Sequence, residues 1–444
     1  MLSLLVSCFG VDLYRDSAGV YSFMARELYA GNYEKAFHPS IPCLNVLLSW
    51  GFSVINLAPE RAIILISSLF YVGTVFFIYK LMRNFFSLRL AEIGALLFAC
   101  APKIIRFSCT GLIDSGKIFF FVLAIYLLLE FIKKNFSSFS TAIYLGLALG
   151  GLSLSRSEAI GNVMLIFFMM FCIYILLVLK KQKPSIWAVM LCGVFWAITC
   201  VIRMLINYFS CGKFIFDQRL SSGVNSKIAQ LFQSFHATPS PAQLAAPAQN
   251  VEPINSALAD YLDCLGGFVR GSYEFYLLLT LLGGLLLYLF TRSKIRVACE
   301  KNGLTIYKWD WRYLILLISV AGNLIIFKLS MIYAYRYFLI NIALLMPFIL
   351  IALSFFFELF SKKINRKVLC VIFSVILGLQ VLNGITPAFD SKGVMVKKTG
   401  IFIGQLIASD NPKVLFIKHS PEWYYSETER ALPLETPRPD LETF

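Results

Sequence analysis

Long apolar runs recur along this chain, and they constrain its fold more than any other feature. A helix needs about 20 mostly apolar residues to cross a bilayer. Of the residues, 58% are hydrophobic and only 15% are charged, against roughly 25% charged residues in an ordinary soluble domain. These values exclude a soluble enzyme, a disordered chain and a fibrous protein. We predict crossings at 62–82, 90–107, 118–132, 141–155, 159–179, 185–206, 273–291, 313–332, 337–357 and 368–386.

Two further apolar stretches do not qualify as complete crossings. Residues 1–11 resemble the outer end of another helix, and they lack the basic region and the A-x-A site of a cleaved signal peptide. Either the start codon is assigned late or the first helix is truncated. The interrupted run 41–57 is expected to lie at the membrane interface. The sequence thus predicts an all-α polytopic membrane protein with about eleven transmembrane helices.

Basic residues define the expected orientation. They are dense in five short loops, which the positive-inside rule places in the cytoplasm. The loops are 80–89, 133–140, 180–184, 292–312 and 358–367. Residues 12–61, 207–272 and 387–444 are then extracytoplasmic, with the N-terminus inside. Membrane topology therefore explains the net charge of +15, and no nucleic-acid partner is expected.

The expected domain organisation is simple. Residues 1–386 form the transmembrane domain, with 12–61 as its first outer loop and 207–272 as its large outer loop; 387–444 form a small extracytoplasmic tail. The eleven cysteines include no CxxC pair and no Cys/His cluster, so no zinc or iron–sulfur site is predicted. Cys211 and Cys264 flank one outer loop and either pair or stay free.

The first outer loop carries the most distinctive pattern. Asp16 with Ser17 can cap a helix, because the side-chain oxygen accepts hydrogen bonds from unpaired backbone N–H groups. Apolar residues then recur at helical spacing up to Gly31-Asn32, which predicts an amphipathic surface helix that ends there. An acidic residue is thereby placed at the outer membrane boundary.

This loop resembles the first loop of bacterial GT-C glycosyltransferases, the family 39-like enzymes related to protein O-mannosyltransferases and aminoarabinose transferases. The shared pattern is RDS-x3-Y-x3-A-x2-L-x2-G-N-Y-x3-F-H-P-x2-P. Three later segments are similar to that family as well: KLMRNFFSLRLAEIGALLFACAP, LGLALGGLSLSRSEAIG and YRYFLINIALLMPFI. The chain departs from the family by lacking the front half of the first helix.

The resemblance implies a GT-C-like helical bundle with juxtamembrane helices on its outer face. It implies an inverting transfer in which the sugar arrives on a polyprenyl phosphate and the first-loop aspartate, here Asp16, is the catalytic base. The expected location is the bacterial inner membrane, with the active site on the extracytoplasmic side. The sugar stays unspecified, and the acceptor is a glycan, a lipid or a protein. Some enzymes of this architecture use a divalent metal ion and others do not.

The residues themselves fit that chemistry. Transfer from a lipid phosphate needs a base for the acceptor proton and cations for the leaving phosphate. Asp16 is the best base, against the alternative that it only caps a helix, and Asp12 is a weaker candidate. Cations near outer helix ends are Lys103, Arg106, Lys117, Arg156, Arg203 and Arg336. We select Arg156, Arg336 and Arg106 as candidate donor-phosphate ligands; the alternative is that they anchor the helices at lipid headgroups.

Four more residues are candidates for the site. Glu158 is placed to orient Arg156 through a charged hydrogen bond, and Asp114 is a second acid on the outer face. His38 is a candidate contact for acceptor or phosphate, and Tyr21 belongs to the first-loop pattern. Each has an ordinary alternative, as an interfacial acid, a loop residue or a packing residue.

Two other functions compete with a glycosyltransferase. A transporter or flippase for lipid-linked glycans also carries outer-face charges, but such folds show inverted repeats and broken helices that this sequence lacks. A membrane polymerase or ligase of glycans usually places its key loop late in the chain, whereas this pattern lies at the start.

Overall fold

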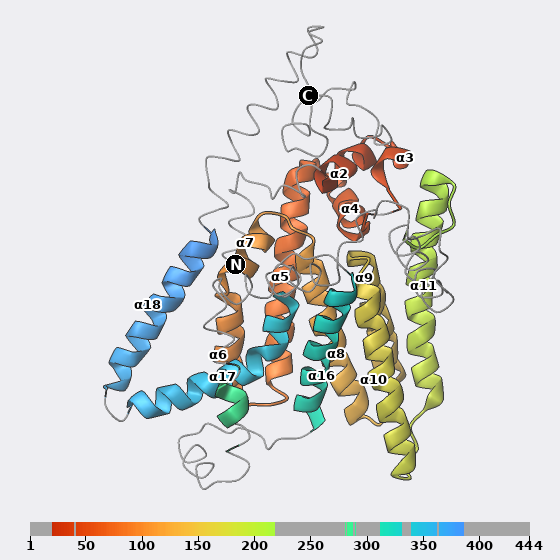
Figure 1. Cartoon of the computed structure of the whole chain (residues 1–444). Helices are drawn as coiled ribbons and strands as arrows, with labels where there is room; N and C mark the ends of the chain where they lie inside the picture. The colour runs from red at the N-terminus through yellow and green to blue at the C-terminus, as the bar shows by residue number, and fades with distance from the viewer. Residues whose placement is uncertain are drawn as a thin grey trace, which may run out of the picture.

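A computed structural model describes residues 20–39, 41–217, 280, 282–286, 289, 311–330, 339–361 and 364–385, and within them the regular structure is helical (Figure 1). The helices near the N-terminus are α2 (Ser22–Tyr29), α3 (Tyr33–Ala36), α4 (Leu44–Trp50) and the 3-10 helix η2 (Gly51–Ile55). The first long helices are α5 (Pro59–Met82), α6 (Leu88–Ala99), α7 (Pro102–Cys109) and α8 (Asp114–Lys133). They are followed by α9 (Phe139–Ser155), α10 (Ala159–Leu179), α11 (Ile186–Cys211), α16 (Trp311–Ser330), α17 (Leu339–Ser361) and α18 (Arg366–Ile385).

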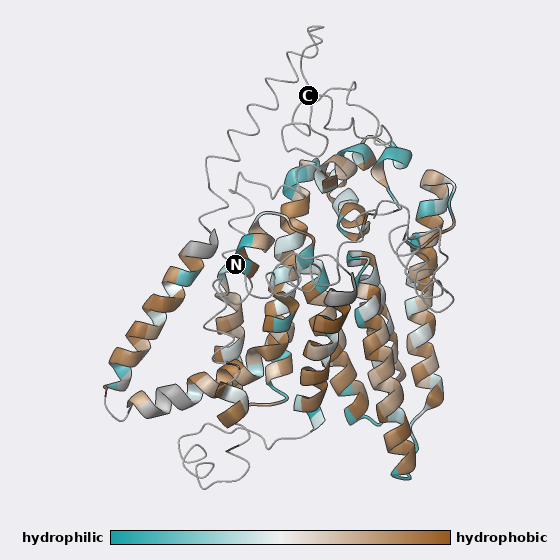
Figure 2. Cartoon of the chain, viewed as in Figure 1, coloured by the Kyte–Doolittle hydropathy of each residue, from teal (hydrophilic) through white to brown (hydrophobic). Residues whose placement is uncertain are grey.

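Four of the described helices are long and apolar enough to cross a membrane: α5, α8, α10 and α11. Each has an 18-residue window with a mean hydropathy of 2.0 or more. The crossings predicted at 62–82, 118–132, 159–179 and 185–206 correspond to these helices. Shorter apolar helices coincide with the crossings predicted at 141–155, 313–332, 337–357 and 368–386. Most of 273–291 lies outside the described residues. Figure 2 shows that hydrophobic residues predominate along the long helices.

The crossing predicted at 90–107 is wrong as a single helix. The chain ends α6 at Ala99 and starts α7 at Pro102. Proline has no N–H to continue the ladder, and it disfavours the helical conformation in the residue before it. Ala101 accordingly adopts an extended conformation, with φ −69° and ψ 113°. This break separates α6 from α7, and the chain then continues through a turn at Gly111 into α8.

Glycines let α9 pack closely against its neighbours. A Cβ at Gly146 or Gly150 would collide with α11, and one at Gly151 would collide with Phe120 of α8. Small residues are common where membrane helices approach each other, because lipid supplies no hydrophobic force between helices and packing must do so. The ends of α8, α9 and α11 are thereby fixed relative to one another.

The helices α2, α3, α4 and η2 form a surface-helix layer (residues 22–55) at one end of the bundle, opposite the turn between α10 and α11 (Figure 1). The predicted surface helix ends as expected, because α2 stops at Ala30 and Gly31 has φ +80°. The run 41–57 forms α4 and η2. The phenol of Tyr29 donates to the carbonyl of Ser49 at 2.6 Å and ties α2 to α4.

This layer packs on the ends of the long helices. Its buried residues form one apolar cluster with Ile63 of α5 and Ile113 before α8. Leu154 of α9 and Ile206 of α11 pack against the same cluster. The layer therefore covers the end of the bundle at which α8 and α10 begin and α9 ends.

Candidate active site

The turn between α7 and α8 places an acidic residue at the start of a spanning helix. Gly111, with φ +76°, ends α7, and α8 begins at Asp114. The hydroxyls of Ser67 and Ser115 donate to the carbonyl of Leu112 at 3.2 and 3.0 Å. Leu112 lies in the turn between the two helices, so the two hydroxyls hold this turn in place. Asp114 is consequently buried, with 2% of its surface exposed.

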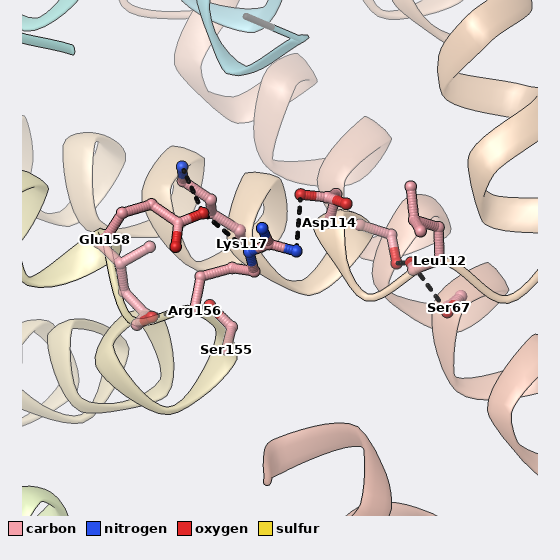
Figure 3. Close-up of polar contacts among 9 residues, drawn as sticks. Ser67, Leu112, Asp114, Lys117, Ser155, Arg156 and Glu158 are labelled. Atoms are coloured by element: carbon pink, nitrogen blue, oxygen red, sulfur yellow. Dashed lines mark hydrogen bonds and ion pairs between the residues drawn. The ribbon is translucent and has the colours of Figure 1, made fainter. Parts of the chain in front are cut away.

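The turn between α9 and α10 places a cation and a second acid opposite Asp114. Arg156 leaves the helical conformation, with φ −157° and ψ 142°, and ends α9. Glu158 then precedes the first residue of α10. The sequence LSRSEA therefore produces a sharp turn at the end of the bundle that carries the surface-helix layer, with both charged side chains directed inward (Figure 3).

Asp114, Lys117, Arg156 and Glu158 form a buried charge cluster (Figure 3). Arg156 Nε donates to Glu158 Oε1 at 2.8 Å. Arg156 Nη1 lies 3.6 Å from Asp114 Oδ1, and Lys117 Nζ lies 3.8 Å from Glu158 Oε1. Two cations and two carboxylates thus compensate one another, as buried charges must.

The cluster fixes the ionisation of Glu158. Burial alone would raise the pKa of this carboxyl group, but Arg156 and then Lys117 outweigh it and lower the pKa to about 2. Glu158 is therefore a carboxylate at neutral pH. Its contact with Arg156 is the charged hydrogen bond that the sequence predicts, while its role in function stays a prediction.

A second buried ion pair adjoins the cluster. Arg203 of α11 is 1% exposed, and its Nη2 lies 2.8 Å from Asp217 Oδ2. Asp217 also accepts a hydrogen bond from Ser157, the residue between Arg156 and Glu158. The two ion-paired groups are thus joined through the α9–α10 turn.

The other predicted site residues have different surroundings. Arg106 is exposed on α7 and takes part in none of the ion pairs that form the buried charge cluster. His38 is half-buried between α3 and α4, and Tyr21 is buried in the apolar cluster of the surface-helix layer. Asp16 and Arg336 lie outside the described residues.

Further sequence predictions fall outside the described residues too. They concern Asp12, Cys264, most of 207–272 and the whole of 387–444. Cys211 is exposed as the last residue of α11.

Three members of these networks were not selected as site residues from the sequence. Lys117 and Arg203 stand out in the sequence as cations near outer helix ends, but nothing there identifies their acidic partners. Asp217 follows α11 in the short segment KFIFD, and no pattern in the sequence marks it as the partner of Arg203. Among the described residues, no group of three or more His, Cys, Asp or Glu side chains could hold a metal ion.

Comparisons with known proteins agree with the prediction of a polytopic membrane protein. The family model of the dolichyl-phosphate-mannose-protein mannosyltransferases matches residues 38–161, a range that includes the whole buried charge cluster. No curated protein sequence matches the chain.

Two solved structures of one protein share this fold. ArnT from Cupriavidus metallidurans, both in the apo state and bound to undecaprenyl phosphate, aligns with a TM-score of 0.56 and 14% identity. The alignment covers 96% of this chain and 83% of ArnT. An oligosaccharyltransferase from Archaeoglobus fulgidus aligns over 98% of this chain and 61% of its own, with a TM-score of 0.48 and 13% identity. The chain is therefore an integral membrane protein with a GT-C-like fold, and the resemblance stated from the sequence is confirmed.

Proposed function

We propose that this protein is an inverting glycosyltransferase that moves a sugar from a polyprenyl-phosphate donor to an acceptor. The donor lies in the bilayer, and the acceptor is a glycan, a lipid or a protein. We place the reaction on the extracytoplasmic side of a bacterial inner membrane, because the positive-inside rule puts the surface-helix layer there.

One observation carries the proposal: two buried cations, Arg156 and Lys117, lie where spanning helices end beneath the surface-helix layer. Buried charge in membrane helices is costly and usually functional. A lipid phosphate would reach this depth from the bilayer, and a guanidinium with an ammonium suits its oxygens. The match to the mannosyltransferase family model and the fold shared with an undecaprenyl-phosphate-bound ArnT support this assignment.

The proposed reaction uses Asp16 as the base and the two buried cations at the phosphate. Asp16 removes a proton from an acceptor hydroxyl or amine, and the acceptor atom attacks the anomeric carbon from the face opposite the phosphate. The bond between the anomeric carbon and the phosphate oxygen breaks, and polyprenyl phosphate leaves with both electrons. Negative charge grows on that oxygen in the transition state, where Arg156 and Lys117 stabilise it.

The acids of the cluster have a positioning role in this proposal. Glu158 and Asp114 hold the guanidinium of Arg156 from two sides, so that it is oriented before the donor binds. Because the cluster is neutral without a donor, the phosphate must compete with these carboxylates. The longest contact, from Lys117 to Glu158, is the first that we expect to open.

The test is a donor panel with purified protein in liposomes. Polyprenyl phosphates that carry different sugars are supplied with candidate acceptors, and free polyprenyl phosphate and glycosylated acceptor are both measured. We expect one donor class to be consumed in equal amounts with product. Donor that changes leaflet without being consumed would instead identify a flippase, and products that lengthen by whole glycan units would identify a polymerase or ligase.

A further inference from the structure

The second ion pair lies at the start of the chain segment that follows α11. Arg203 Nε donates to the carbonyl of Phe216 at 2.7 Å, and its Nη2 pairs with Asp217 at 2.8 Å. Asn207, one turn further along α11, donates to the carbonyls of Ile215 and Phe216 at 2.7 and 3.1 Å. The returning segment 213–217 is therefore held against α11 by side chains of α11 itself.

Asp217 also reaches a different element. Its Oδ2 accepts hydrogen bonds from Arg203 of α11 and from the hydroxyl of Ser157. Ser157 is flanked by Arg156 and Glu158, the two residues whose side chains meet at 2.8 Å in the buried charge cluster. One buried carboxylate thus links helix α11 to the turn that carries the candidate phosphate ligand.

We propose that Asp217 is a positioning residue, which acts through Ser157 to hold the α9–α10 turn so that Arg156 faces the donor phosphate. The proposal rests on the proposed function. It assigns Asp217 no contact with substrate.

The physical reason for this arrangement is orientation. Arg156 is the extended residue that breaks α9, so its backbone is not held by a helical hydrogen-bond ladder. The turn has backbone hydrogen bonds of its own, from Ala159 N–H to Arg156 and from Ile160 N–H to Ser157, and Asp217 adds a fixed group from outside the turn. A displacement of about 1 Å in a positioning group can cost on the order of 100-fold in rate. A buried ion pair adds little to stability compared with apolar packing. The contribution of the Arg203–Asp217 pair is therefore to orient the turn that carries Arg156.

Ser157→Ala is the most selective test, because it removes the link to the turn and leaves the Arg203–Asp217 pair in place. We expect kcat/KM for the donor to fall about tenfold, with most of the change in kcat, since misdirected Arg156 loses its interaction mainly in the transition state. Thermal stability in detergent should change little. The matched control is Ser137→Ala in the α8–α9 turn, whose hydroxyl donates only to the nearby carbonyl of Lys134 in its own turn; its kinetics should stay those of wild type.

A double-mutant cycle then shows whether the effect passes through Arg156. In a protein that already carries Arg156→Lys, adding Ser157→Ala should lower kcat/KM very little further. The guanidinium that Ser157 helps to orient is already absent there. Asp217→Asn should give the same kinetic result as Ser157→Ala in the cycle. It should also lower the stability of the protein, because the buried Arg203 loses its charged partner. Additive losses, or wild-type kinetics in Ser157→Ala, would overturn the proposal. A wild-type protein that consumes no donor would instead overturn the proposed function, and this inference with it.

Discussion

Replacing Glu158 by glutamine tests the electrostatics of the buried charge cluster. Glutamine keeps the shape and one hydrogen-bond acceptor, but it removes the charge that faces Arg156 at 2.8 Å and Lys117 at 3.8 Å. Two buried cations then share one carboxylate, that of Asp114. The variant should therefore fold less stably at neutral pH.

The size of the loss follows from the pKa of Glu158. Its fall from 4.5 to about 2 in the folded protein corresponds to about 3 kcal/mol, since one tenfold step is about 1.4 kcal/mol. Breaking a buried ion pair elsewhere costs about 3–5 kcal/mol, which agrees. Because the folded pKa is depressed, this stability is fully present above pH 4.5 and is lost as the pH falls toward 2.

The assay is equilibrium unfolding of purified protein in detergent, followed by tryptophan fluorescence from pH 7 down to pH 3. The gap between wild type and Glu158→Gln should be about 3 kcal/mol at pH 7 and shrink below pH 4.5. The control is Glu130→Gln, whose partner Lys133 is 37% exposed; that pair should contribute less than about 1 kcal/mol. Equal losses in the two variants, or a gap that does not change with pH, would refute the reasoning.

Three other predictions concern catalysis, packing and topology. Asp16→Asn should lower the transfer rate on the order of 100-fold or more at normal membrane abundance, as for other lost general bases, while Asp12→Asn should do much less; similar rates in the two variants would remove the base assignment. Gly150→Ala should destabilise the bundle, because its Cβ would collide with α11, whereas Gly193→Ala, with nothing within 4 Å, should not; equal melting temperatures would contradict this packing. Cysteine labelling in intact cells should modify a reporter at the carboxyl end but not one within 180–183, and the opposite pattern would invert the topology.

The sequence predicted the long helices because apolar length is read directly from composition. The runs that became α5, α8, α10 and α11 were found within a few residues of their bounds. The break before Pro102 was missed because the apolar run continues through it, although proline is a visible reason for a helix to restart there. A hydropathy window averages over many residues, so a single proline hardly changes its value. The same proline is enough to end a helix.

The site was predicted only in part, because the sequence shows contacts between near neighbours but not contacts that depend on helix packing. Arg156 and Glu158 are two residues apart, so their contact is local and the sequence could show it. Asp114 lies 42 residues before Arg156, and only the packing of α8 on α9 brings the two together. Arg106 was a further candidate, but the sequence does not show which side of a membrane helix meets lipid, because that face is as apolar as the face that meets protein. The partner of Arg203 could not be found because the return of the chain to Asp217 depends on tertiary contacts.

The central claim is that Arg156 holds the phosphate of a polyprenyl lipid, and direct binding of undecaprenyl phosphate to purified protein tests it most simply. Native mass spectrometry would compare wild type with Arg156→Lys, Arg156→Ala and the exposed control Arg83→Ala. A hydrogen bond to a charged group contributes about 1.5–3 kcal/mol, so Arg156→Ala should bind roughly 10- to 100-fold more weakly. Arg156→Lys should be intermediate, because it keeps the charge but loses the paired donors, and Arg83→Ala should match wild type. Equal affinity in all four proteins would contradict the account.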